Sequence, residues 1–286
     1  MEKPKIISPV VYPMFPGEKP DIRLLAIDLD DTLLTGGLII TPRTKKAIQA
    51  ACRQGVAVTL ATGRMFTSAL PYAQELGIGL PLITYQGALV RTPDGQTISH
   101  HPIDQRLCVE LLSFLLPFGC HVNVYIEDQF YIEKTSPEAE RYRARIRTAY
   151  HEVPSLLAMM AESAMGATKI ALMADKERIS EIMAAIRSHF QERVLAVPSK
   201  PTFLEINRPD TGKGVALAVM AEGMGIGRLQ VMAIGDSPND LDMIEYAGWG
   251  IVMANGEDAV KEKARWVTAS NEEEGVAVAI EHLVLK

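Results

Sequence analysis

The chain has 286 residues, of which 48% are hydrophobic and 22% charged, with a mean hydropathy of +0.08. These values are typical of a globular protein with a sizeable core, and the length suggests two domains. The formal net charge of −6 and the lack of a dense Lys/Arg block argue against nucleic-acid binding, and the lack of an uncharged apolar run of about 18 residues argues against a membrane protein.

The first part of the chain is rich in proline, at Pro4, Pro9, Pro13, Pro16 and Pro20. Proline has no backbone N–H to donate and breaks helices, so this spacing is incompatible with a helix and unfavourable for a central strand. We predict an extended N-terminal arm over residues 1–20.

Beyond the arm, short apolar runs alternate with segments of helix length. The apolar runs are 24–27, 56–60 and 80–84, and the predicted helices between them are 41–55 and 65–76. Thr41 and Pro42 are typical of a helix start, whereas Gly55 and Gly77 are typical of a helix end. Continuous apolar strands joined by helices predict a parallel sheet that is covered on both faces.

The same pattern returns toward the C-terminus. Apolar runs at 231–234 and 249–253 flank a predicted helix at 239–247, and further helices are expected around Ala259 and Val278. Together the two stretches predict a doubly wound α/β core with a Rossmann-like parallel sheet, built from residues 21–86 and 202–286.

Residues 87–201 follow a different pattern. The turn Pro93-Asp94-Gly95 between the runs 88–91 and 97–100 is a hairpin signal. The remaining predicted elements are strands at 122–125, 130–132 and 169–173 and helices at 104–116, 138–147 and 177–190. This mixture predicts a smaller α+β domain, a cap, inserted into the core.

The cysteines and the N-terminus bear on the compartment. Cys52, Cys108 and Cys120 form no Cys-x-x-Cys pair, which is typical of reduced thiols in a reducing environment. The N-terminal residues show no apolar stretch of the kind that a secretory signal needs. We therefore expect a cytoplasmic protein.

Polar residues follow several of the predicted strands. Ligands of doubly wound sheets bind beyond the carboxyl ends of the strands, so these residues define the candidate site. They are Asp28-Leu29-Asp30-Asp31-Thr32, Thr62-Gly63-Arg64 and Gly235-Asp236-Ser237-Pro238-Asn239-Asp240, together with Thr211-Gly212-Lys213-Gly214 before an apolar helix. We expect all four segments to meet at one edge of the sheet.

Four carboxylates in this set predict a cation. If Asp28, Asp30, Asp236 and Asp240 gather at one edge, each like-charge pair about 4 Å apart costs about 4 kcal/mol at an effective dielectric near 20. The cluster then needs a metal ion or bound protons. Oxygen ligands without His or Cys favour a hard ion, and few carboxylates next to a phosphate suit Mg²⁺.

These motifs, in this order, resemble those of the haloacid dehalogenase-like phosphatase superfamily, specifically its Cof-type branch with an α/β cap. The residues that carry the resemblance are Asp28-Leu29-Asp30-Asp31-Thr32-Leu33-Leu34, Thr62-Gly63-Arg64, Glu205-Ile206 with Gly212-Lys213-Gly214, and Gly235-Asp236-Ser237-Pro238-Asn239-Asp240 with Val252-Met253-Ala254-Asn255. The resemblance spans residues 21–286. It implies a Mg²⁺-dependent phosphatase that acts on a small phosphorylated metabolite, such as a sugar phosphate, a nucleotide or a cofactor phosphate.

The resemblance also implies a role for each residue. Asp28 is expected to be the nucleophile that forms a phospho-aspartate, and Asp30 the general acid and base; residues two apart at a strand end point the same way. The expected phosphate ligands are Thr62, Gly63, Lys213 and Asn239. The metal is expected on the Asp28 and Asp236 carboxylates and the Asp30 carbonyl, with Asp240 orienting a bound water.

Two positions depart from the family pattern. Asp31 stands where the family often has glycine, and Gln86-Gly87-Ala88 replaces the usual Asn-Gly-Ala at the cap entry. The first change should leave the backbone carbonyls usable, while the second leaves the substrate contact of that amide open.

Alternatives with the same pocket stay open at this level. A phosphosugar mutase would yield an isomerised product, and a phospho-acceptor signalling module would keep its phosphate, although such a module needs no general acid like Asp30. We expect no nucleic-acid or membrane partner and a monomer or homodimer. The sequence does not identify the substrate or the cap residues that select it.

Overall fold

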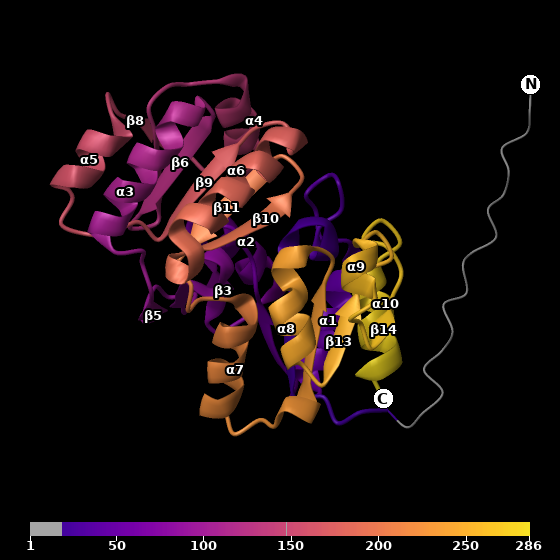
Figure 1. The fold of residues 1–286 in the computed structure, drawn as a ribbon. Coiled ribbons are helices and arrows are strands. Elements are labelled where there is room, and N and C mark those ends of the chain that lie inside the picture. Colours follow the sequence, from indigo (N-terminus) through magenta and orange to yellow (C-terminus); the bar gives the residue numbers. More distant parts are fainter. Residues whose placement is uncertain (1–18, 147) are drawn as a thin grey trace, which may run out of the picture.

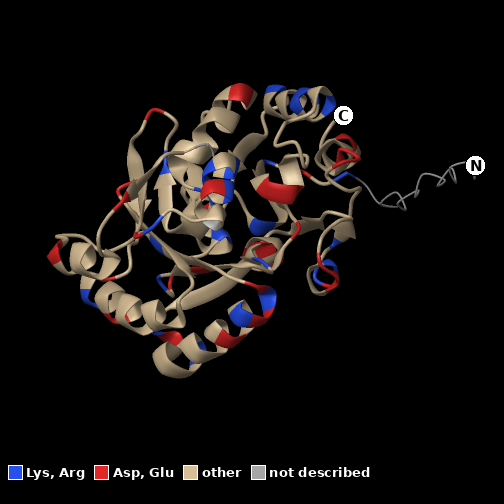
Figure 2. Cartoon of the chain, turned by 90° about the horizontal axis from the view of Figure 1, so that it is seen from above, with Lys and Arg blue, Asp and Glu red and all other residues tan. Residues whose placement is uncertain are grey.

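In the computed structural model, residues 19–146 and 148–286 are described. Residues 1–18 of the predicted N-terminal arm lie outside the described residues. The chain forms a five-stranded sheet with flanking helices and, above it in Figure 1, a six-stranded sheet with helices of its own. Among the described residues, no helix is both long and apolar enough to cross a membrane. Seen from above, acidic and basic segments are interspersed over the helices (Figure 2).

The five-stranded sheet is parallel, as predicted, in the order β14-β13-β12-β1-β2. Its strands are β1 (Leu24–Ile27), β2 (Ala57–Leu60), β12 (Val231–Gly235), β13 (Trp249–Val252) and β14 (Trp266–Val267). β1 lies between β2 and β12, although about two hundred residues separate β1 from β12 in the chain. The pairing joins the two distant halves of the predicted core and so confirms the doubly wound α/β class.

Helices cover both faces of this sheet. They are α1 (Pro42–Arg53), α2 (Phe66–Leu76), α7 (Lys213–Gly223), α8 (Leu241–Tyr246), α9 (Asp258–Lys261) and α10 (Gly275–Leu283). In β1, Leu25 and Ile27 pack into a core with α1 and α10, while Leu24 and Ala26 pack into a second core with α7 and α8. Both sets are buried because successive strand residues point to opposite faces. The run is therefore apolar throughout instead of alternating.

The six-stranded sheet has the order β10-β11-β9-β6-β7-β8. Its strands are β6 (His121–Ile126), β7 (Gln129–Ile132), β8 (Tyr150–Glu152), β9 (Lys169–Met173), β10 (Leu195–Lys200) and β11 (Phe203–Asn207). Its helices are α3 (Gln105–Leu115), α4 (Pro137–Ile146), α5 (Leu156–Glu162) and α6 (Lys176–Phe190). Of these elements, β8, α5, β10 and β11 have no counterpart among the predicted ones.

The two faces of the six-stranded sheet differ. Ile170 and Leu172 of β9 pack with α3, α5 and α6 in a separate core. Ala171 on the opposite face belongs to the same core as residues of the five-stranded sheet, together with Tyr125 and Phe203. α4 lies on this second face, because its Ala139 and Ile146 are buried there. The face of the six-stranded sheet that carries α4 is therefore directed toward the strand ends of the five-stranded sheet.

A third sheet, of three strands, connects the two units. β3 (Leu82–Thr84), β4 (Leu89–Arg91) and β5 (Thr97–His100) pair antiparallel, which matches the predicted hairpin. β3 pairs with the main sheet through an isolated bridge between Ala61 and Ile83.

These pairings alter the predicted domain boundaries. β4 and β5 extend from core strand β3, so the hairpin placed in the cap is continuous with the core. Residues 203–207 belong to the predicted core segment 202–286, yet they form β11, which pairs antiparallel with β9 and β10 inside the six-stranded sheet. The sequence of β11 is apolar enough for either sheet, and only long-range pairing decides between them. We propose that the cap runs from the end of β5 to Asn207.

Asp128 docks the cap onto the core. It lies in the tight turn between β6 and β7, and its carboxylate accepts hydrogen bonds from Phe66 N and Thr67 N, both at 2.9 Å, at the start of α2. It also accepts one from the hydroxyl of Tyr85 at 2.9 Å. A cap residue thus satisfies the first backbone donors of a core helix that directly follows Thr62-Gly63-Arg64.

We expect Asp128→Ala to lower the free energy of unfolding by about 2 kcal/mol, because a buried Tyr85 hydroxyl and two helix-end donors lose their acceptor. Urea unfolding measures this loss. Asp94→Ala in the exposed hairpin turn is the control, and an equal effect of the two substitutions would contradict the docking role.

Candidate active site

Asp28 lies directly after β1 and is buried. Its backbone N donates to Ile234 O at 3.0 Å, so the neighbouring strand β12 fixes its position. The chain then makes one wide helical turn over Leu29–Leu33, within which Asp31 has φ +63°. Glycine adopts this left-handed conformation most easily and Asp tolerates it, which explains why Asp31 can stand where the family often has glycine.

Lys213 bridges two of the predicted acids. Its Nζ donates to Asp28 Oδ1 and to Asp240 Oδ1, both at 2.6 Å, and the lysine is completely buried at the start of α7. Burial lowers the pKa of this ammonium, but Asp240 and Asp28 outweigh it and hold the pKa above its usual range. Lys213 is therefore a permanent positive charge beside the carboxylate of Asp28.

Gly87 packs closely against Gly212, the residue directly before Lys213. Gly87 has φ +85°, and a Cβ on it would lie 2.1 Å from the carbonyl oxygen of Gly212. Only glycine allows the end of β3 to pack this closely against the loop before α7. The glycine of the cap-entry motif is thus a packing requirement of the site.

Asp28, Asp236 and Asp240 form the metal-competent cluster: one carboxylate oxygen of each lies within 4.8 Å of the others. Thr32 donates to Asp236 Oδ1 at 2.7 Å, and Asp240 Oδ2 accepts from Asp236 N at 3.0 Å. Burial, and then the charge of Asp240, raises the pKa of Asp236 to about 7. Burial likewise raises the pKa of Asp28, against the effect of Lys213.

These three carboxylates fit the expected cation. They offer only oxygen ligands, which hard divalent ions prefer, and one lysine does not balance their charge. Burial is the main cause of the raised pKa values of Asp28 and Asp236, and the neighbouring carboxylates raise them further. The donor set is therefore suited to Mg²⁺. The carboxylate of Asp30 is not part of this cluster.

Thr62 and Gly63 follow β2 at the same edge. Arg64 N donates to Thr62 Oγ1 at 3.1 Å, so the threonine hydroxyl keeps its proton for another acceptor. The Gly63 carbonyl accepts from Nζ of Lys169 at 2.7 Å, and Lys169 also pairs with Glu205 at 2.7 Å. Lys169 lies in β9 and is fully buried, so the six-stranded sheet helps to fix this loop.

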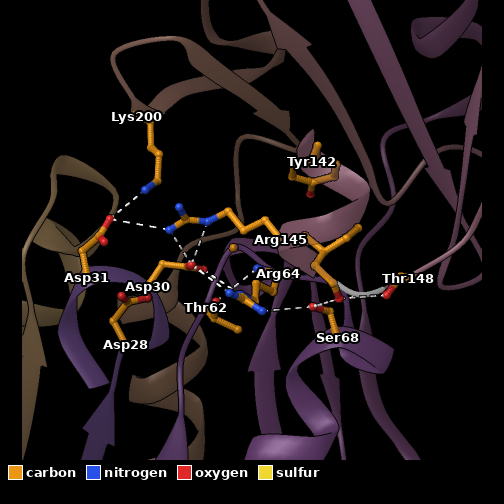
Figure 3. A network of polar contacts seen from close by, with 12 residues as sticks. Asp28, Asp30, Asp31, Thr62, Arg64, Ser68, Tyr142, Arg145, Thr148 and Lys200 are labelled. Carbon is orange, nitrogen blue, oxygen red and sulfur yellow. Dashed lines mark hydrogen bonds and ion pairs between the residues drawn. The ribbon is translucent and has the colours of Figure 1, made fainter. Parts of the chain in front are cut away.

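Asp30 faces a different set of partners from Asp28. Arg64 binds both of its oxygens, at 2.7 and 2.8 Å, and Arg145 of α4 donates to Oδ1 from two nitrogens, at 3.1 and 2.7 Å (Figure 3). Burial would raise the pKa of Asp30, but the hydrogen bonds and charge of Arg64, followed by those of Arg145, hold it well below its usual range. Asp30 is ionised in this conformation.

A cavity of about 650 Å³ connects these groups. Core residues that line it include Asp28, Asp30, Thr62, Gly63, Asp236 and Asn239, while the cap contributes residues such as Tyr142, Arg145, Met173, Lys200 and Phe203. Asn239 accepts a hydrogen bond from the Ser237 hydroxyl. Lys213 and Asp240 lie behind Asp28, buried completely. The predicted site residues thus gather at one edge of the sheet, between core and cap.

Comparison with known proteins decides the family. A model described as haloacid dehalogenase-like hydrolase matches residues 25–280. The chain belongs to this family. YxeH of Bacillus subtilis (strain 168) is 34% identical over 276 residues, covering 92% of this chain and 98% of YxeH. YcsE of the same strain, a 5-amino-6-(5-phospho-D-ribitylamino)uracil phosphatase by name, is 30% identical, covering 94% of this chain and 98% of YcsE.

Solved structures of haloacid dehalogenase-like hydrolases share the fold. One from B. subtilis superimposes with a TM-score of 0.84 at 26% sequence identity, covering 92% of this chain and all of the other. The fold of this hydrolase and the phosphatase relatives support the predicted enzyme class, a phosphoric monoester hydrolase.

Sequence reasoning missed several residues of the site. Arg145, Lys200 and Lys169 are not among the predicted site residues. Gln86 was left open: its amide nitrogen donates to Glu205, beside the Lys169 ion pair, and Gln86 does not line the cavity. Apart from the basic run that contains Arg145, no sequence signal marked these residues, because each acts through contacts between core and cap.

Proposed function

We propose that the protein is a Mg²⁺-dependent phosphatase that hydrolyses a small phosphorylated metabolite through a phospho-aspartate on Asp28. The observation that carries the proposal is the position of the Asp28 carboxylate: it lies at the cavity floor, bonded to the buried Lys213 and next to Asp236. The phosphatase relatives, among them one named for a phosphorylated ribitylaminouracil, support a small metabolite as substrate.

In the first step, an Asp28 oxygen forms a bond to phosphorus while the bond from phosphorus to the leaving oxygen breaks, and Asp30 gives that oxygen a proton. In the second, water attacks phosphorus, Asp30 takes a proton from the water, and the bond to Asp28 breaks to release inorganic phosphate. Thr62, Gly63 and Asn239 line the cavity and would donate hydrogen bonds to the phosphoryl oxygens. Lys213 supplies fixed positive charge as negative charge builds up.

A bound Mg²⁺ would be held by the Asp28 and Asp236 carboxylates and the Asp30 carbonyl, with Asp240 orienting a water, and would offset the repulsion between these acids and the phosphate. Asp30 is ionised while Arg64 and Arg145 both bind it, which is the state that accepts a proton from water. Proton donation in the first step needs a neutral Asp30, so one arginine must turn away when substrate is bound.

The test is release of inorganic phosphate from a panel of phosphorylated metabolites and from p-nitrophenyl phosphate, with excess Mg²⁺. We expect steady turnover that falls at least about 100-fold in EDTA and returns when Mg²⁺ is restored. Full activity in EDTA would refute the metal. An isomerised product without free phosphate would point to a mutase, and a stable phosphoprotein without turnover would point to a signalling module.

A further inference from the structure

Two cations of the cap reach down to the core at the cavity wall. Arg145 of α4 donates to Asp30 at 2.7 Å and lies 3.7 Å from Asp31, and Lys200 at the end of β10 donates to Asp31 at 2.7 Å (Figure 3). The side chains of Arg145 and Lys200 are 35% and 36% exposed, and both line the cavity. Neither belongs to the catalytic motifs.

The charges in this upper layer do not balance. Among the described residues, the ion pairs of Arg64, Arg145 and Lys200 are with the carboxylates of Asp30 and Asp31, so three cations share two carboxylates. The cavity floor has the opposite imbalance, since three carboxylates there face Lys213. A bound metal ion would balance the excess negative charge at the cavity floor. No step of the proposed chemistry uses the excess of positive charge near the cap.

We propose that Arg145 and Lys200 bind a second anionic group of the substrate, remote from the phosphoryl group that is transferred. The substrate class is then a phosphorylated metabolite that carries a carboxylate or a further phosphate at its other end. The inference rests on the proposed function and specifies its substrate. Arg145 can offer a planar fork of N–H donors to such an anion and Lys200 a point charge.

The present ion pairs of these cations can be exchanged cheaply. Asp31 is 41% exposed and Lys200 36%, and pairs this open to solvent contribute only about 0–1 kcal/mol. The ion pair between Asp31 and Lys200 is therefore weak. A ligand anion that enters the cavity replaces the Asp31 carboxylate on Lys200 and the weaker 3.7 Å contact on Arg145.

The experiment compares two open-chain ligands that differ only in an end group: 6-phosphogluconate ends in a carboxylate where glucitol 6-phosphate ends in a hydroxymethyl group. Each is used as a competitive inhibitor of p-nitrophenyl phosphate hydrolysis with Mg²⁺, which gives an inhibition constant whether or not it is itself turned over. We expect 6-phosphogluconate to inhibit about tenfold more tightly, a difference of about 1.4 kcal/mol.

Variants assign this preference to the cap cations. Lys200→Gln should bring the two inhibition constants to within about twofold of each other, whereas Lys134→Gln, at an exposed cap lysine outside the cavity lining, should keep the wild-type ratio. Asp31→Asn should increase the ratio, because it removes the carboxylate that competes for both cations. Asparagine also tolerates the left-handed backbone at this position.

Four results would overturn the inference. Equal inhibition constants in the wild type, or a ratio unchanged by Lys200→Gln, would overturn the inference and leave the phosphatase intact. A ratio that falls in Asp31→Asn would show that Asp31, Arg145 and Lys200 only latch the cap, which also overturns it. No hydrolysis of p-nitrophenyl phosphate by the wild type with Mg²⁺ would overturn the proposed function and this inference with it.

Discussion

Replacing Asp28 by asparagine should lower kcat by at least about 10³-fold, equivalent to about 4 kcal/mol of transition-state stabilisation. The amide has nearly the same shape as the carboxylate, but it cannot form the bond to phosphorus that the proposed first step requires. Steady-state phosphate release with saturating Mg²⁺ measures the loss. Asparagine can still accept the hydrogen bond from Lys213, so we expect the melting temperature to be retained.

Asp258→Asn is the matched control, because that side chain is 98% exposed on α9 and far from the cavity lining. It should leave kcat unchanged. Wild-type turnover in a folded Asp28→Asn variant would refute the assignment of the nucleophile, whereas loss of the melting transition would show that the substitution acts on folding instead.

The second large effect is expected at Lys213. Lys213→Met should lower the free energy of unfolding of the metal-free protein by about 3–5 kcal/mol, because the buried Asp28 and Asp240 lose the cation between them. It should also reduce kcat by about 10²–10³-fold, since a preorganised charge is lost where negative charge develops. Urea unfolding in EDTA and phosphate release with Mg²⁺ measure the two effects.

The loss of stability should depend on pH in a definite direction. Burial raises the pKa of Asp236 to about 7 and also raises that of Asp28, so the folded state binds more protons than the unfolded state as the pH falls through the raised pKa of Asp236. Protons then replace part of the missing positive charge. The destabilisation by Lys213→Met should therefore be smaller at about pH 6 than at about pH 8.

Lys263→Met makes the same substitution at an exposed lysine and serves as the control for both measurements. We expect it to change the free energy of unfolding by less than about 0.5 kcal/mol at either pH. A Lys213→Met protein as stable as the control at about pH 8 would contradict the role of Lys213 as the buried counter-charge of the acidic cluster.

Much of the fold could be predicted from the sequence because local patterns specify it. The apolar run at 24–27 is buried on both faces, as expected for a strand of a covered parallel sheet, and the helix that starts at Thr41-Pro42 begins and ends almost as its capping residues predict. The site residues could also be predicted, because they follow the carboxyl ends of the predicted strands. Parallel strands carry their carboxyl ends to one edge, so Asp28, Thr62 and Asp236 meet whatever the length of the insertion.

What could not be predicted depends on pairing between distant segments. The strand Phe203–Asn207 is buried throughout, and nothing within it indicates that it joins the cap sheet next to β9. Arg145 lies in a helix with several arginines, and only the docking of the cap selects it to contact Asp30. Lys169 gives no local signal for its contact with the Gly63 carbonyl. Local sequence patterns therefore do not predict which residues form contacts between cap and core.

The central claim is that a phosphoryl group passes through the carboxylate of Asp28. The most direct measurement is to mix the wild-type enzyme with substrate and Mg²⁺, quench in acid within milliseconds to seconds, and search its peptides by mass spectrometry for a phosphoryl group that hydroxylamine removes. We predict a transient acyl phosphate on the peptide that contains Asp28, absent from Asp28→Asn. Phosphate release in burst or steady state with no label on that peptide, or with the label on another residue, would contradict the account.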